Sequence, residues 1–132
     1  MFDACAPLAV AAPEATAEQL ASIDDAIAMW NGDGVAGLSR ADTGAITIEF
    51  RDAADAFHGF YDAPNATVYI NVRLTDSGER AIVVAHELGH AYALVHISPE
   101  DHPSVMNPGN LTVVPNASDT AALQALWGPC PR

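Results

Sequence analysis

The chain has 132 residues, of which half are hydrophobic and 17% are charged, so we expect one folded domain over residues 1–132 rather than a disordered chain. Its formal net charge is −12, which excludes the clustered cations that a nucleic-acid surface needs. No apolar run approaches the ~20 residues of a membrane span. We therefore expect a monomer without a nucleic-acid or membrane partner, whose acidity serves solubility or else attracts basic substrates.

The first predicted element is a helix over residues 16–30. Thr16 and Gln19 have the spacing of a capping box, in which each side chain bonds the backbone N–H group of the other residue. Apolar residues then recur at helical spacing as far as Trp30. The run Asn31-Gly32-Asp33-Gly34 is expected to end this helix.

Two strands are predicted next, over residues 45–50 and 66–72. The first alternates in polarity, both are rich in β-branched residues, and a turn at residues 62–65 precedes the second. Residues 57–61, which lie between them, are a candidate for a short third strand.

A second helix is predicted to begin at Asp76 or Ser77, either of which can cap it, and to run to about Tyr92. The segment 98–115 that follows is rich in Pro, Asn and Gly, which predicts an ordered loop.

A short closing helix is expected over residues 119–127. Ser118 is its predicted cap, and Gly128-Pro129 is expected to end it.

The run HELGHAYALVH, residues 86–96, has the spacing of a catalytic zinc site. His86 and His90 lie four residues apart, so a helix presents both on one face, and Glu87 lies beside the metal, where it can act on a bound water. His96 comes six residues after His90, so the helix must end and the chain must turn back. Three neutral imidazoles leave a fourth position on zinc for water, which is typical of a catalytic site. The alternative is an ordinary amphipathic helix with surface or core histidines.

Two motifs resemble those of the metzincin metallopeptidases. The run from His86 to His96 matches their HExxHxxGxxH signature at every position but one, and Ser104-Val105-Met106-Asn107 resembles their Met-turn. The closing segment SDTAALQALWG is similar to the C-terminal helix of the matrixins, to which the chain is most similar. The resemblance is strong over residues 66–128 and weak before them.

This resemblance implies an α/β (α+β) domain of metzincin-like zincin fold, with a twisted mixed sheet, an active-site helix and a C-terminal helix. An upper subdomain of about residues 1–92 and a lower one of about residues 93–132 are expected to flank a cleft. The strand over residues 66–72 is expected to be the sheet edge that lines the cleft, where an extended peptide can bind by adding a strand. Met106 is expected to form an apolar floor beneath the metal ligands.

The one mismatch with the signature falls at Ala93, where the family has glycine. Glycine suits the end of a helix because it enters the left-handed region without steric penalty, whereas alanine there costs roughly 1–2 kcal/mol. Either Ala93 carries this strain or the helix ends through a different turn.

The expected function is that of a zinc endopeptidase, which hydrolyses peptide bonds in proteins or peptides with one catalytic Zn²⁺ as cofactor. Glu87 takes a proton from the zinc-bound water as hydroxide attacks the amide, and then passes it to the leaving amine. The expected ligands are His86, His90 and His96. The alternative is a catalytically silent zinc-binding module that serves recognition, although such a module has no need of the base at Glu87.

Other candidates for the third ligand are His102 and Asp101, should His96 not serve. Some metzincins have a tyrosine just after the Met-turn as a further ligand, but Asn107-Pro108 stands there in this chain, so we expect no such ligand.

An additional structural metal is an open question. His58 lies in the sequence near Asp52, Asp55 and Asp62, which is only faintly similar to the metal-binding loops of matrixins. The alternative is a solvated acidic loop.

The two cysteines, Cys5 and Cys130, lie near opposite ends of the chain. In an extracellular setting they are expected to form a disulfide, and the alternative is two free thiols in a cytosolic protein. A third possibility, Cys5 as an inhibitory zinc ligand, is disfavoured because its neighbours do not resemble the matrixin cysteine switch. No signal peptide is visible, so we expect the mature domain of a secreted protein, with its leader outside this sequence.

Overall fold

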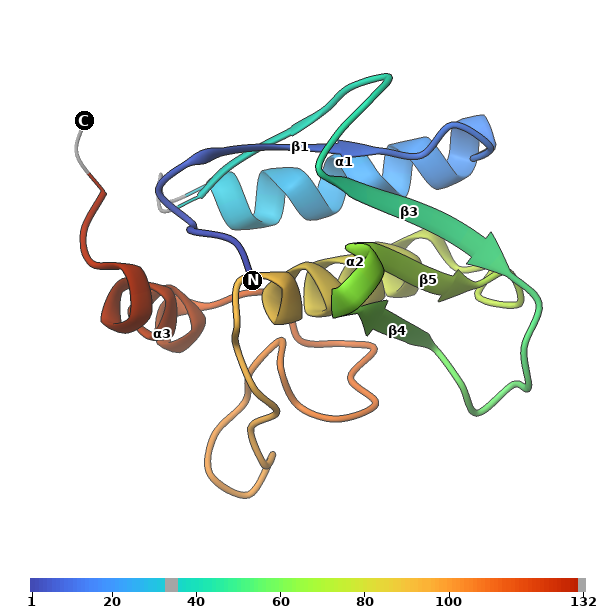
Figure 1. Cartoon of the computed structure of the whole chain (residues 1–132). Helices are drawn as coiled ribbons and strands as arrows, with labels where there is room; N and C mark the ends of the chain where they lie inside the picture. Colours follow the sequence, from blue (N-terminus) through green and yellow to red (C-terminus); the bar gives the residue numbers. More distant parts are fainter. Residues whose placement is uncertain (33–35, 131–132) are drawn as a thin grey trace.

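The computed structural model describes residues 1–32 and 36–130, and within them one five-stranded mixed sheet is covered by helices (Figure 1). The elements are β1 (Pro7–Ala11), α1 (Ala17–Asn31), β2 (Gly37–Arg40), β3 (Ile46–Arg51), β4 (Gly59–Asp62), the 3₁₀ turn η1 (Ala63–Asn65), β5 (Thr67–Asn71), α2 (Ser77–Ala91) and α3 (Ala117–Trp127). The strand order is β2-β1-β3-β5-β4. All neighbouring strands are parallel except β4, which runs antiparallel to β5. The α/β fold class expected from the sequence is confirmed.

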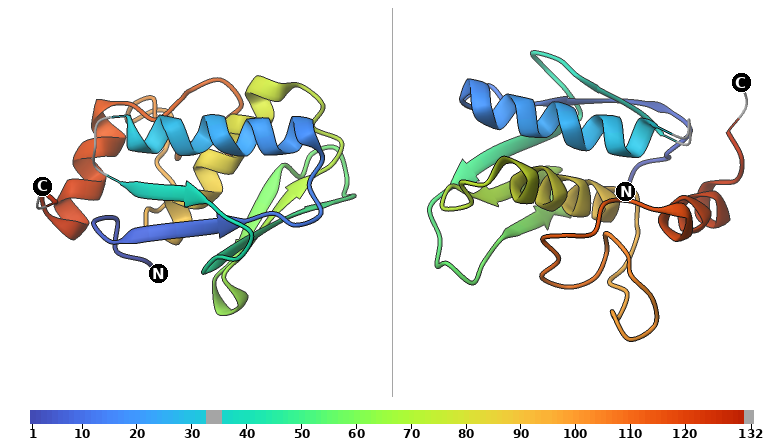
Figure 2. Two further views of the ribbon diagram at one scale, coloured as in Figure 1. Left: turned by 90° about the horizontal axis from the view of Figure 1, so that it is seen from above. Right: turned by 180° about the vertical axis from the view of Figure 1, so that it is seen from behind.

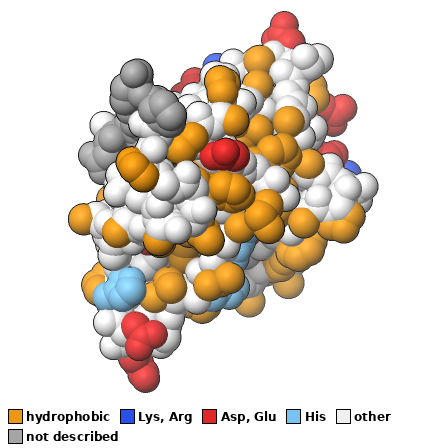
Figure 3. Space-filling view, turned by 60° about the vertical axis from the view of Figure 1, so that its left-hand side comes forward, with side chains coloured by type: hydrophobic (Ala, Val, Ile, Leu, Met, Phe, Trp, Pro, Cys, Tyr) orange, Lys and Arg blue, Asp and Glu red, His pale blue; other side chains and the backbone are white. Residues whose placement is uncertain are grey.

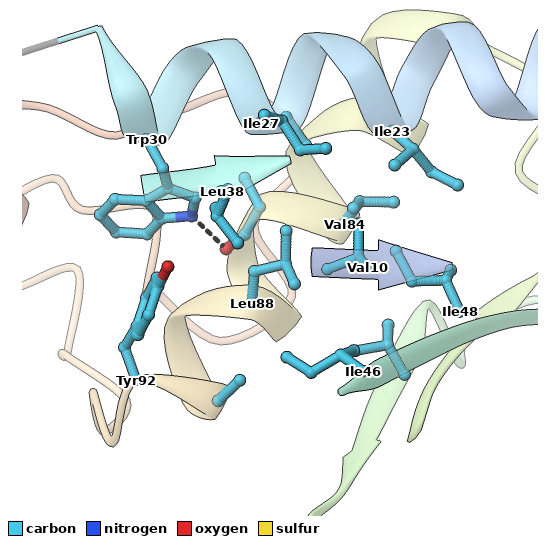
Figure 4. Close-up of a cluster of buried hydrophobic side chains, with 14 of the residues drawn as sticks. Val10, Ile23, Ile27, Trp30, Leu38, Ile46, Ile48, Val84, Leu88 and Tyr92 are labelled. Atoms are coloured by element: carbon cyan, nitrogen blue, oxygen red, sulfur yellow. Dashed lines mark hydrogen bonds between the residues drawn. The ribbon is translucent and has the colours of Figure 1, made fainter. Parts of the chain in front are cut away.

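The hydrophobic core lies between one face of the sheet and the helices α1 and α2, which pack against each other (Figure 2). Alternate residues of the strands point to this face because side chains of a strand alternate sides, and Val10, Ile46 and Ile48 are fully buried there. They face Ile23 of α1 and Leu88 of α2 (Figure 4). This packing makes α2 a rigid support for whatever its other face presents.

Trp30 closes the core at the end of α1. Its indole N–H donates a hydrogen bond of 2.9 Å to the carbonyl of Ala85, in the middle of α2 (Figure 4). The large ring is 1% exposed, so its single polar group needs this partner. The contact ties α1 to the part of α2 that immediately precedes the HELGH run.

The predicted helix starts agree with the structure except in one case. Thr16 and Gln19 form both bonds of a capping box, and Asp76 caps α2 through the N–H of Glu79. The cap of α3 is Asn116, not Ser118 as the sequence suggested, because the Asn116 side chain accepts from two N–H groups of the first turn and Asp119 completes a capping box. Both Asn and Ser are good caps, so sequence alone left this choice undetermined.

Two strands of the sheet were not foreseen. β1 is rich in alanine and begins at Pro7, and β2 has only one buried residue, Leu38, so neither has the β-branched alternation that predicts a strand. They belong to the sheet because β2 pairs with β1 and β1 pairs with β3. Asp33 and Gly34, the last two residues of the run that was expected to end the first helix, lie outside the described residues.

The expectation that residues 66–72 form the edge of the sheet was wrong. β5 (Thr67–Asn71) lies inside the sheet, hydrogen-bonded to β3 on one side and to β4 on the other. The edge strand next to β5 is β4, the short strand anticipated at residues 57–61, because the tight turn at η1 folds it back on β5; β2 forms the opposite edge. The open edge therefore belongs to a strand that comes earlier in the chain.

The two ends of the chain are joined by a disulfide between Cys5 and Cys130, with Cα atoms 5.1 Å apart. The predicted bond is therefore present. Near it, the indole N–H of Trp127 donates to the carbonyl of Tyr92 at 3.0 Å, so α3 is also held to the end of α2.

Arginine is the only cationic side chain apart from histidine, since the chain contains no lysine. Among the described residues, Arg40, Arg51 and Arg73 form exposed ion pairs, and Arg80 is buried with hydroxyl and carbonyl partners. Acidic side chains scattered among hydrophobic ones dominate the charge on the face in Figure 3. No helix in the described part of the chain is long and apolar enough to cross a membrane.

Candidate metal centre

The first two histidines of the HELGH run lie on α2, which is buried along almost its whole length. His86 is 9% exposed and His90 is half-buried, and their four-residue spacing places both on the same face of the helix. Since the opposite face of α2 packs on α1 and the sheet, the helix cannot rotate without breaking the core. The positions of both imidazoles follow from that packing.

The third histidine, His96, lies close to the other two because α2 ends and the chain turns back sharply at Ala93. The N–H of Ala93 donates to the carbonyl of His90 at 2.9 Å, and the N–H of Leu94 donates to the carbonyl of Gly89 at 3.0 Å. These two bonds form a Schellman motif, in which the residue at C′ is left-handed. Ala93 has φ 72°, so of the two alternatives posed by the sequence, alanine adopts the backbone conformation of the motif glycine.

This turn brings His96 to the other two imidazoles. Its Nε2 lies 3.3 Å from Nε2 of His86 and 3.2 Å from Nε2 of His90. One ligand atom from each of the three residues lies within 4.8 Å of the others, and no other group of three or more potential ligands occurs within the described ranges. The sequence-predicted triad is thus assembled.

The tautomers of two histidines follow from their neighbours. Nδ1 of His86 lies 2.7 Å from the carbonyl oxygen of Val105, and Nδ1 of His90 lies 2.9 Å from that of Leu94. A carbonyl can only accept, so each Nδ1 carries the proton and each Nε2 presents a lone pair toward the centre of the cluster. Burial lowers the pKa of His86 to about 4 and also lowers that of His90, which favours the neutral rings.

This arrangement fits a metal ion. The Nε2 lone pairs of His86 and His90 both point toward Nε2 of His96, so three potential ligand atoms converge at close range. Two nitrogens each about 2.05 Å from a zinc ion and at a tetrahedral angle are about 3.3 Å apart. The separations of 3.3 and 3.2 Å from His96 to His86 and His90 match that value, and all three ligand atoms lie within 4.8 Å of one another, so the three histidines could hold a metal ion.

Glu87 lies beside the cluster and is 4% exposed. Burial raises the pKa of its carboxyl group to about 7, because the charged form loses hydration. Edge strand β4 approaches it closely at Gly59, where an added Cβ would lie 3.3 Å from Glu87 Cγ and 2.9 Å from Val83 Cγ1. A side chain at position 59 would therefore push either the strand or the carboxylate out of place.

The cluster opens into a cleft of about 550 Å³. Its lining comes from β4 and the residues before it, from α2, and from the loop after the turn at residues 104–107: Ala56, Phe57, His58, Gly59, Phe60, Tyr61, Val83, His86, Glu87, His90, His96, Gly109 and Asn110. In the part of the chain that the structure describes, β4 pairs along one edge only, so its other edge is open along this cleft. The cleft thus combines a metal-binding cluster, a buried carboxylate and an unpaired strand edge.

Met106 lies in the turn at residues 104–107, which the sequence indicated as a Met-turn. Its side chain is 1% exposed and packs directly on α2: a Cβ added at Gly89 would lie 2.5 Å from Met106 Sδ. A side chain at position 89 would therefore force the Met106 side chain to move. That Met106 forms an apolar floor beneath the metal ligands stays a prediction.

Two residues that matter for the site were not recognised from the sequence. Asp119 was read only as the start of a helix and Ser104 only as part of a turn, but both are buried and bonded to each other, with Oγ to Oδ1 at 2.5 Å. The side chain of Asp119 also accepts from the N–H of Val105 at 3.1 Å. An aspartate three residues after an asparagine cap was the only available signal, and it indicates a capping box rather than a link to the turn.

The spare ligands lie elsewhere. The His102 side chain is exposed and lines a separate hollow of about 580 Å³, between the end of α2 and α3, and neither it nor Asp101 belongs to the cluster. Of the residues considered for a structural metal, Asp52 and Asp55 both pair with Arg73 instead.

Fold and site together define a mixed α/β protein with a candidate metal centre formed by its helix α2 and the segment that follows it. Among solved structures the chain is similar to myroilysin, with a TM-score of 0.70 over 99% of this chain and 82% of that one. The sequence identity is 14%, so the similarity concerns the fold. No protein-family model matches the sequence, and no curated protein matches it significantly.

Proposed function

We propose that this protein is a zinc-dependent endopeptidase that hydrolyses peptide bonds in proteins or peptides. The observation that carries the proposal is the convergence of three imidazole Nε2 atoms beside the buried carboxylate of Glu87, within a cleft bordered by an open strand edge. The fold shared with myroilysin supports it. Within the metzincins we place the chain nearest the matrixins, because of the turn at residues 104–107 and the closing helix α3.

His86, His90 and His96 would hold the zinc ion. When bound there, zinc supplies a Lewis acid that polarises a carbonyl group and lowers the pKa of water to about 7. The protein's part is to orient the rings, which the carbonyls of Val105 and Leu94 do for His86 and His90, while burial lowers the pKa of these two histidines and so favours their neutral form.

Glu87 is the group that moves protons. Its carboxylate form accepts a proton from water, and its acid form then donates that proton to the leaving amine. Because Glu87 is buried next to β4, its carboxyl group has little access to bulk water. A single residue can therefore serve both halves of the hydrolysis.

The substrate is expected to be an extended peptide. An unpaired edge strand offers backbone N–H and C=O groups that an extended chain can bond by adding a strand, and β4 has such an edge along the cleft. We also propose an extracellular location, since the Cys5–Cys130 disulfide persists in oxidising compartments.

Metal analysis combined with cleavage of a peptide library tests the proposal. We expect one zinc ion per chain and cleavage by the unmodified protein, both lost on chelation and restored by zinc. Glu87→Ala should keep its zinc but lose about 10²–10⁴-fold in rate, because only the proton-transferring group is removed. His96→Ala should lose zinc, whereas the matched control His102→Ala should retain it.

Two results would overturn the proposal in different ways. Full zinc occupancy with no cleavage of any library member would favour the alternative of a catalytically silent recognition module. Cleavage by Glu87→Ala at the unmodified rate would show that another group moves the proton.

A further inference from the structure

We propose that Asp119 is a positioning residue for the metal centre, acting on His86 through Ser104 and the peptide bond between Val105 and Met106. The inference rests on the proposed metal site, because its consequence is a change in the ligand strength of His86. Asp119 lies on α3, 33 residues beyond His86, and does not contact the three histidines.

The connection is a chain of three hydrogen bonds. Nδ1 of His86 lies 2.7 Å from the carbonyl oxygen of Val105. The N–H of the same peptide unit, on Met106, donates to Oγ of Ser104 at 2.9 Å. The Ser104 hydroxyl in turn donates to Oδ1 of Asp119 at 2.5 Å.

All three bonds point the same way. Each group donates toward Asp119, and the carboxylate at the end accepts on both oxygens: Oδ1 from Ser104, and Oδ2 from the N–H groups of Val105 and Asn116. Hydrogen bonds aligned head to tail polarise one another, most strongly where the surroundings are dry. Ser104 is 0% exposed and Asp119 3%, so little solvent screens the chain. The negative charge of Asp119 therefore makes the Val105 carbonyl a stronger acceptor for His86.

A stronger acceptor at Nδ1 raises the basicity of Nε2 and fixes the ring plane. Ligating histidines commonly reach this state through a directly bonded carboxylate. In this protein a hydroxyl and a peptide unit lie between the carboxylate and the ring. The second bond from Val105 to Asp119 holds the same turn from its other side, so the acceptor carbonyl is fixed in direction as well as polarised.

His90 provides an internal comparison. Its Nδ1 is held by the carbonyl of Leu94 at 2.9 Å, but among the described residues no side chain extends that bond toward a carboxylate. The proposed influence of Asp119 is therefore specific to His86. General loosening of the fold would affect both rings, so a change at His86 without a change at His90 would be specific to Asp119.

The test uses Asp119→Asn, which removes the charge, and Ser104→Ala, which breaks the chain but leaves the bonds from Asp119 to Val105 and Asn116. Controls are Asp101→Asn, an equal charge change on the neighbouring loop, and Ser118→Ala, an equal loss of hydroxyl at the start of α3, where Oγ bonds only Asn116. If Asp119→Asn fails to fold, Ser104→Ala still decides the question.

Two measurements are made. Zinc affinity is determined by chelator competition, and the Nδ1 proton resonances of His86 and His90 are followed by NMR in the metal-free protein. We expect zinc binding about 10–100-fold weaker in Asp119→Asn, weaker also in Ser104→Ala, and unchanged in both controls. The His86 Nδ1 proton should move upfield in both test variants while that of His90 stays in place.

The outcomes separate this inference from the proposed function. Unchanged zinc affinity with an unmoved His86 resonance would overturn the inference, as would equal shifts of both histidines. If the unmodified protein binds no zinc, the proposed function fails, and the proton resonances still decide whether Asp119 acts on His86.

Discussion

The backbone of Ala93 has φ 72°, a conformation that glycine adopts freely and alanine does not. Neighbouring residues hold this conformation in place. The carbonyls of Gly89 and His90 accept the two hydrogen bonds that close the helix, and the next residue, Leu94, is buried. Strain at this residue is thus the consequence of bringing His96 back to the helix.

Ala93→Gly should therefore stabilise the protein. Relief of the left-handed strain is worth roughly 1–2 kcal/mol, and the greater freedom of glycine in the unfolded chain offsets about 0.4–1 kcal/mol of it. Urea unfolding should show a net gain of up to about 1.5 kcal/mol by this reckoning. The control Ala121→Gly, at an exposed position inside α3, should instead lose about 1 kcal/mol, and a loss at both positions would contradict the strain at Ala93.

Glu87 should make the stability of the metal-free protein depend on pH. Its pKa rises from 4.5 to about 7 on burial, so the folded state keeps a proton that the unfolded state releases between these values. Its contribution is complete below about pH 4.5 and is lost as the pH rises through about 7, a change of roughly 3 kcal/mol.

Unfolding free energies of Glu87→Gln and the unmodified protein, both metal-free, should therefore diverge as the pH rises from 5 to 8, with the variant becoming relatively more stable. The control Glu100→Gln, at an exposed position, should follow the unmodified protein. A constant difference between Glu87→Gln and the unmodified protein over this range would contradict the raised pKa.

At the scale of elements, α3 is held at both ends. Asp119 in its first turn bonds Ser104 and Val105, and the Cys5–Cys130 disulfide lies just beyond its last turn. The helix therefore links the start of the chain to the turn that carries Met106. Removing either attachment leaves the other in place, so the contribution of each to the stability of the protein can be measured separately.

Removing the disulfide should lower stability substantially. The bond closes a loop with a sequence separation of 125 residues, for which the chain-entropy model gives about 4–5 kcal/mol. The double variant Cys5→Ser/Cys130→Ser should show a lower melting temperature, with the difference absent when both proteins are measured under full reduction. Alkylation of two thiols in the native unmodified protein would show that the bond is not formed.

At the scale of the whole molecule, charge is the dominant imbalance. Seventeen acidic residues face five arginines, and the described arginines are already engaged in ion pairs or hydrogen bonds. Most acidic groups therefore repel one another without compensation, which disfavours the compact state.

Sodium chloride should accordingly stabilise the protein. The Debye length falls from about 30 Å at 0.01 M salt to about 3 Å at 1 M, so the repulsion is largely screened. We expect the melting temperature to rise steadily over this range and to rise equally with potassium chloride. A fall, or a rise with only one of the two salts, would show that general screening is not the cause.

Much of the site could be predicted because its information is local. The four-residue spacing of His86 and His90, the neighbouring Glu87 and the offset of His96 are properties of one short segment, and helix geometry converts them directly into positions. Capping boxes such as that of Thr16 and Gln19 are local in the same way. At Ala93 the sequence indicated where the helix had to stop but left open whether alanine adopts the left-handed conformation there.

What only the tertiary structure decided depends on partners far apart in the chain. The edge of the sheet belongs to β4 rather than β5 because strand order is set by which strands pair, and no segment carries that order in its own pattern. β1 and β2 are strands because they pair with each other and β1 with β3, not because of their composition. The link from Asp119 to His86 joins a helix to a turn and a turn to another helix, and each bond requires the folded backbone to bring its donor and acceptor together. Sequence determined the reacting groups, whereas long-range packing decided which surfaces and supports surround them.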